Sequence, residues 1–178
     1  MTDAAIRPIH PVTLALMLAA VATACSTTPV LHGPTMSFPG PAPSPGMTQD
    51  GPHFVAASPT ECVPYARGLS GIDLRGNANT WWAQAAGVYP RSAIPAVGSV
   101  IVINSTGLGH VAVVTRIVSD RVILVDHANW HGREEVAVNV PVRDVSEDNS
   151  WSQVNVWWLD TNQWGSKVYS VEGFIHPR

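Results

Sequence analysis

Residues 97–130 read VGSVIVINSTGLGHVAVVTRIVSDRVILVDHANW, and this stretch decides the fold. Three apolar, β-branched runs, at 99–103, 111–118 and 122–125, are separated by short polar or glycine-containing segments. β-Branched residues favour strands, and the segments between the runs are typical of turns. The stretch therefore predicts three consecutive buried strands, with polar residues at the strand ends.

The second and third of these strands form a hairpin if residues 119–120 make the turn. Facing residues then have numbers that sum to 239, so His110 lies opposite Asn129. Because side chains alternate between faces along a strand, His127 and Asn129 share the face of His110. Asp126 points to the other face. A shift of one residue would exchange His127 for Asp126, so the register decides which of them accompanies His110.

Composition limits the possible partners. The chain has 178 residues, with 10 Lys or Arg against 13 Asp or Glu, a formal net charge of -3 and a single lysine, Lys167. Nucleic-acid-binding domains normally carry a basic surface, and this balance provides none. We therefore expect no nucleic acid partner. The length of the chain allows one domain plus an extension.

Residues 1–24 predict an export signal peptide. Arg7 precedes an apolar run at 12–22, which is shorter than the roughly 20 residues that a membrane-spanning helix needs. The small residues before Cys25 fit either ordinary signal peptidase cleavage or the bacterial lipobox, which implies lipidation of Cys25. Residues 25–57 are rich in Pro and Gly and predict a disordered tether. Together they predict a lipoprotein exported to the bacterial cell envelope (the periplasm) and attached to a membrane.

The folded domain is expected over residues 58–178, and Ser58-Pro59 predicts the start of its first helix. Serine is a preferred N-cap, proline is tolerated at the first helical position, and Glu61 completes a capping box. Cys62 then lies in the first turn, where the helix dipole and free amide groups lower the pKa of a thiol. A single unpaired cysteine there, with a strand-borne histidine downstream, indicates a nucleophile and its base. An inert buried thiol is the alternative.

The remaining chain predicts a second short helix at 77–86 and further strands at 136–140, 154–159 and 168–175. Trp130, Trp151 and Trp164 fall in turn-like contexts. Tryptophan in such positions either anchors a loop or lines a groove, here for glycan or stem peptide.

Several motifs resemble, in their order and spacing, those of the CHAP family of cysteine- and histidine-dependent amidohydrolases and peptidases. This family is related to the NlpC/P60 peptidases and distantly to papain. The resemblance is strong over residues 58–130 and looser beyond them. Its motifs are Glu61-Cys62-Val63-Pro64-Tyr65-Ala66-Arg67, Gly76-Asn77-Ala78, Trp81-Trp82, Pro95-Ala96-Val97-Gly98-Ser99-Val100 and Gly109-His110-Val111-Ala112-Val113-Val114.

The resemblance implies an α+β fold, a papain-like CHAP domain with N-terminal helices packed on an antiparallel β-sheet. It also implies a peptidoglycan amidase or endopeptidase in which Cys62 attacks an amide and His110 is the general base. Many CHAP sequences have Glu-x-Asn-Trp where this chain has residues 127–130. The third, orienting residue is therefore His127, as in NlpC/P60 relatives that use histidine, or Asp126, whose carboxylate suits imidazole. Asn129 would support it through hydrogen bonds.

The residue before the cysteine departs from the glutamine that is frequent in the family. The carboxylate of Glu61 cannot donate a hydrogen bond to an oxyanion, so the amide of Cys62 is the better donor. Asp126, His127 and His131 are not expected to bind a metal, because neither a cysteine pair nor a helical His-x-x-x-His pattern accompanies them.

No cofactor is expected, and the expected partner is peptidoglycan, with no protein partner indicated. Two alternatives to the wall hydrolase stay open. One is a thiol amidohydrolase that acts on a non-wall substrate. The other is a non-catalytic lipoprotein that binds the cell wall.

Overall fold

The computed structural model describes residues 51–105 and 107–178. The predicted signal peptide, the predicted lipidation at Cys25 and residues 25–50 of the predicted tether lie outside the described residues. Within the described part, no helix has the length and apolar character that crossing a membrane requires. Strand accounts for 43% of the described residues and helix for 15%, so the domain is mostly β.

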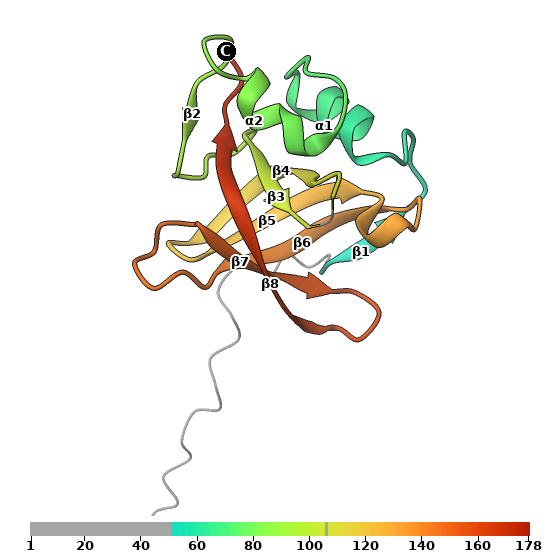
Figure 1. Ribbon diagram of the computed structural model, residues 1–178. Helices are drawn as coiled ribbons and strands as arrows, with labels where there is room; N and C mark the ends of the chain where they lie inside the picture. The colour runs from blue at the N-terminus through green and yellow to red at the C-terminus, as the bar shows by residue number, and fades with distance from the viewer. Residues whose placement is uncertain (1–50, 106) are drawn as a thin grey trace, which may run out of the picture. The chain divides into compact units, whose positions relative to one another are not determined.

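The described strands are all antiparallel and belong to one sheet. They are β1 (His53–Val55), β2 (Arg91–Ser92), β3 (Val100–Asn104), β4 (His110–Ser119), β5 (Val122–Ala128), β6 (Val136–Asp144), β7 (Gln153–Trp158) and β8 (Gln163–Ile175). Strand β7 pairs with both β6 and β8, and β8 also pairs with β3. Strands β3 to β8 therefore close into a six-stranded barrel, with β1 and β2 added on β6 and β8 (Figure 1).

The expected α+β architecture, with N-terminal helices packed on an antiparallel sheet, is wrong. The described residues contain only two short α-helices, α1 (Cys62–Ser70) and α2 (Trp81–Gln84), beside the 3-10 turns η1 (Ala78–Thr80) and η2 (Trp130–Gly132). Alternation of apolar residues predicts that strands exist. It does not predict closure, because closure depends on the pairing of β8 with β3, which lies far away in the sequence.

Apolar side chains pack on both faces of β3 and β4. Ile101 and Ile103 point into the barrel, where they join a core that includes Trp151 and Phe174. Val100 and Val102 point outward and pack with the helical segment, which includes Ala66 of α1 and the fully buried Trp81 of α2. Burial on both faces explains why residues 100–103 form a continuous apolar run instead of an alternating one.

The first helix begins later than its sequence predicts. Helix α1 starts at Cys62 with Glu61 as its N-cap, and no side chain caps it, so the capping box from Ser58 is wrong. The helix ends before Gly71, which adopts a left-handed φ of 73° and whose N–H donates to the Arg67 carbonyl. Strand β1 pairs with β6 and lies inside the predicted tether, so the ordered sheet begins before residue 58.

The register of the β4–β5 hairpin differs at its two ends. The turn is at residues 120–121, and Ser119 faces Val122, so the predicted register is wrong beside the turn. Two irregularities follow, and each shifts the pairing by one residue. Val113 then faces Asp126, which restores the predicted sum of 239 where the polar residues lie.

Candidate active site

Cys62 and His110 come together in one cleft. Cys62 is the first residue of α1, and His110 is the first residue of β4. Both line a cavity of about 330 Å³, together with Asn129 and Trp130. The cleft therefore brings together a thiol and an imidazole, the two groups that a cysteine nucleophile and its base require.

The resting thiol is neutral. Burial raises the pKa of Cys62 above its usual value, and the charge of Glu61 acts in the same direction. The backbone N–H of Val111 and those of Cys62 and Val63 favour the thiolate and lower this pKa, but burial outweighs them. The expected net lowering of the Cys62 pKa is therefore wrong, although the helix-start amides act in the expected direction. A base must remove the thiol proton when the nucleophile forms.

His110 is held by His127. The Nε2 atom of His110 lies 2.9 Å from Nδ1 of His127, and both side chains are 3% exposed. The contact leaves Nδ1 as the ring nitrogen of His110 available to another partner. When His110 donates through Nε2, its Nδ1 carries the free lone pair that can accept a proton.

Both histidines are neutral at physiological pH. Burial lowers the pKa of His110 well below 6.5, and the neighbouring His127 and His131 lower it further. Burial likewise lowers the pKa of His127 to about 4, with a smaller contribution from His131. A neutral His110 is in the protonation state of a general base.

Asp126 lies apart from this pair. Its Oδ1 accepts a hydrogen bond of 2.8 Å from the backbone N–H of Asn139. It acts electrostatically on Tyr65 of α1, whose pKa it raises together with burial. The structure therefore brings His127 to His110 and leaves Asp126 on the other face of the strand, as the register at this end of the hairpin predicts.

Asn129 lines the cleft, but its hydrogen-bond partners differ from those expected. Its Nδ2 donates to Oε2 of Glu61 at 2.7 Å, and its Oδ1 accepts from the N–H of Glu134 at 3.1 Å. Its backbone is left-handed, with a φ of 57°. Asn129 thus ties the end of β5 to the start of α1, and its hydrogen bonds in the described residues do not reach the histidine pair.

Aromatic rings enclose the histidines. The Trp130 ring packs edge-on against His110, with centroids 4.7 Å apart, and lies 5.4 Å from the His127 ring. His131 also contacts Trp130, and its Nε2 lies 3.2 Å from the hydroxyl of Tyr169 on β8. Sequence reasoning missed Tyr169, because only the closure of the barrel brings β8 to this site.

Gly109 fixes the approach of the chain to His110. Its φ is 73°, and a Cβ atom there would lie 2.6 Å from the backbone nitrogen of Asn79. The Asn79 N–H donates to the Leu108 carbonyl at 2.9 Å, so η1 and this loop are held together. Gly107 has open space around it, although it lies in the same loop.

Replacing Gly109 by alanine is expected to lower the free energy of unfolding by about 2–4 kcal/mol, because strain and a backbone clash add together. It should also reduce any activity that depends on His110. Urea unfolding of Gly109→Ala measures the loss, and Gly107→Ala is the matched control that should stay within about 0.5–1 kcal/mol of the native protein. Equal effects of the two substitutions would contradict this account of the loop.

Among the residues that the structure describes, no group of three or more His, Cys, Asp or Glu side chains is placed to hold a metal ion. Residues 54–129 match the model of the CHAP domain, a cysteine- and histidine-dependent amidohydrolase and peptidase domain. The match includes Cys62, His110 and His127, and the resemblance seen in the sequence is confirmed over these residues. This family implies hydrolase or peptidase activity. A comparison with curated proteins finds no match.

Proposed function

Because residues 54–129 match the model of the CHAP domain, we propose that this protein is a cysteine hydrolase that cleaves amide bonds of peptidoglycan. One observation carries the proposal: His110 lines a cleft together with Cys62, and its ring lies 2.9 Å from that of the buried His127. His127 is the orienting residue in this proposal. It accepts the Nε2–H of His110 and so keeps Nδ1 unprotonated.

The proposed reaction begins with a neutral thiol and a neutral imidazole. Nδ1 of His110 takes the thiol proton while the sulfur of Cys62 bonds to the amide carbon of the substrate. The first amides of α1 have no intrahelical partner, so those of Cys62 and Val63 can donate to the oxyanion. His110 then protonates the leaving amine as the C–N bond breaks. Water, deprotonated by His110, hydrolyses the thioester and restores the thiol.

The N-terminal segments support a location for this activity. An export signal, lipidation of Cys25 and a tether that ends before β1 would hold the domain at a membrane of the cell envelope. The tether would then let the domain reach a wall that lies some distance away. We therefore place the protein in the periplasm as a membrane-anchored lipoprotein.

Digestion of purified peptidoglycan, read by mass spectrometry of the released fragments, tests the activity and identifies the bond. Replacing His127 by alanine should lower the rate by about 10²-fold or more, because His110 loses the partner that fixes its tautomer. Asp126→Asn is the matched control, one residue away on the opposite face, and should change the rate by less than about threefold.

A larger loss from Asp126→Asn than from His127→Ala would overturn the assignment of His127. A folded protein that releases no fragment from several wall types would overturn the hydrolase itself. The wall-binding lipoprotein would then be the better reading, and affinity for insoluble peptidoglycan would measure it.

A further inference from the structure

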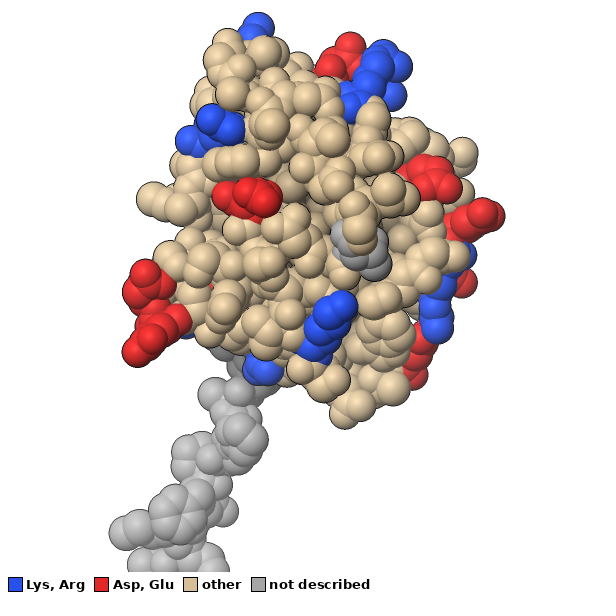
Figure 2. All heavy atoms as spheres, viewed as in Figure 1, with Lys and Arg blue, Asp and Glu red and all other residues tan. Residues whose placement is uncertain are grey.

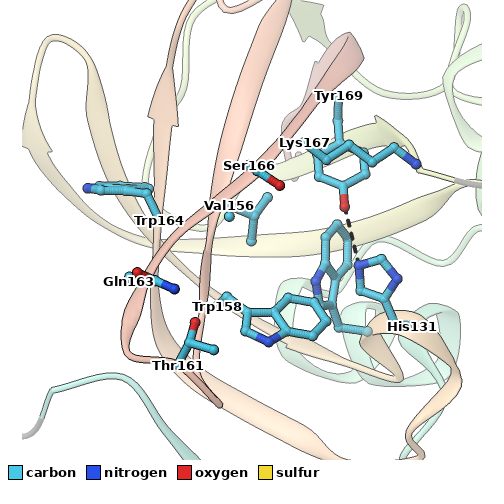
Figure 3. A pocket seen from close by; sticks show the side chains of 11 residues that line it. His131, Val156, Trp158, Thr161, Gln163, Trp164, Ser166, Lys167 and Tyr169 are labelled. Carbon is cyan, nitrogen blue, oxygen red and sulfur yellow. Dashed lines mark hydrogen bonds between the residues drawn. The ribbon is translucent and has the colours of Figure 1, made fainter.

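A second cavity lies along the β7–β8 hairpin. It has a volume of about 580 Å³ and is called the hairpin groove here. Its lining includes Trp130, His131, Trp158, Gln163, Lys167 and Tyr169. Figure 3 shows the Trp158 indole pointing toward His131, and the dashed line joins His131 to the Tyr169 hydroxyl. The volume falls in the range of small-molecule sites, about 300–1,000 Å³.

The hairpin groove adjoins the active-site cleft. Trp130 and His131 line both cavities, so the two share these side chains as a common wall. Lys167 on β8 also lies between the groove and the cleft. Its Nζ is 3.4 Å from the carbonyl oxygen of Ser105, which lines the cleft. An occupant of the groove would therefore lie beside the active-site cleft.

The lining has aromatic faces and neutral hydrogen-bonding groups. Trp158 and Tyr169 provide the faces, while Thr161, Gln163 and Ser166 provide hydroxyl and amide groups. Lys167 is the only fully charged side chain among the described residues of the lining, and no carboxylate accompanies it. Figure 2 likewise shows charged side chains scattered among uncharged ones, with no extended area of one sign.

The aromatic walls are held in place before anything binds. The rings of Trp158 and His131 have centroids 5.0 Å apart, and Trp130 and Tyr169 are 5.3 Å apart. The guanidinium group of Arg133 lies 5.7 Å from the Trp158 ring and pairs with Asp160 at 2.6 Å. Fixed rings lose little conformational entropy on binding, which favours a ligand that stacks on them.

From these features we propose that the hairpin groove binds the glycan strand of the substrate, with an N-acetylated sugar ring stacked on Trp158. This inference rests on the proposed function. The C–H face of a pyranose matches an aromatic ring, and its hydroxyl and acetamido groups match the neutral side chains. A stem peptide carries several carboxylates, and one lysine among neutral residues complements them poorly. The groove then directs Cys62 to the amide that joins the glycan to the stem peptide.

The test uses the full chain carrying Cys62→Ala, which binds without turnover, and a β-1,4-linked N-acetylglucosamine tetramer as the probe. Isothermal titration calorimetry should detect binding, and the further substitution Trp158→Ala should weaken it by about tenfold. Trp158→Phe keeps an aromatic face and should retain most of the affinity. Trp82→Phe, on the helical side of the domain, is the control for general effects of altering a tryptophan. Thermal unfolding of each variant shows that the fold is kept.

The outcomes separate the two proposals. Tetramer binding that depends on Trp158, in a protein that does not hydrolyse peptidoglycan, supports the groove and overturns the proposed function. Hydrolysis without tetramer binding, or tetramer affinity that is equal in Trp158→Ala, overturns the groove as a glycan site. A synthetic stem tetrapeptide that binds instead, with its affinity lost in Lys167→Met, assigns the groove to the peptide and also overturns the proposal.

Discussion

Replacing Cys62 by serine, or His110 by glutamine, should lower peptidoglycan hydrolysis at least about 10³-fold. The thiol is neutral at rest because burial raises its pKa, so its nucleophilicity depends on the transfer of its proton to His110. A serine hydroxyl is far harder to deprotonate than a thiol. Glutamine can still hydrogen-bond to His127 but cannot accept a proton.

The double variant gives the sharper result. If the thiol and the imidazole act as one unit, Cys62→Ser with His110→Gln should lose no more activity than either single substitution. Fragments released from peptidoglycan measure the rate, and urea unfolding shows that the variants fold. Residual activity above a few per cent in Cys62→Ser would contradict thiol catalysis. Losses that multiply in the double variant would contradict the proton transfer between the two groups.

Acid should destabilise the domain strongly through the histidine pair. The pKa of His127 is lowered from 6.5 to about 4 in the fold, so the unfolded chain binds more protons between these values. Stability is therefore complete above pH 6.5 and decreases as the pH falls toward 4. A shift of this size corresponds to a loss of about 3 kcal/mol. The lowered pKa of His110 adds to the loss in the same direction.

The free energy of unfolding at pH 7.5 and at pH 4.5, measured with urea, tests this expectation. His127→Gln keeps an acceptor for His110 but does not titrate, so it should lose less stability between the two pH values. Burial raises the pKa of Asp126, which favours folding as the pH falls and opposes the histidines. The contribution of Asp126 is the same in the native protein and in His127→Gln. The difference between their losses of stability therefore measures the contribution of His127. Equal losses would contradict a neutral, buried His127.

The site was more predictable from the sequence than the architecture was. Side-chain alternation near the ends of β4 and β5 placed His110 and His127 on one face, although the predicted turn was wrong by one residue. Two irregularities between the turn and the site cancel that error. An irregularity of this kind depends on how neighbouring strands twist and pack, and no local pattern in residues 110–128 predicts it.

Long-range pairing set the limit of prediction. Strand β8 pairs with β3 across some 70 residues of sequence, and this pairing converts a sheet into a barrel and brings Tyr169 to His131. The state of Cys62 was mispredicted for a related reason. A position at a helix start is visible in the sequence, whereas the burial that outweighs it arises from the packing of α1 against β4.

Closure of the barrel also has a consequence for the behaviour of many copies at high concentration. A sheet offers its unpaired edges to other chains, and long exposed edges promote aggregation. The strand path of the described sheet ends in β1 and β2, which are only three and two residues long. Edges so short are poor templates for pairing between chains. Copies of the protein that crowd together can therefore stay separate.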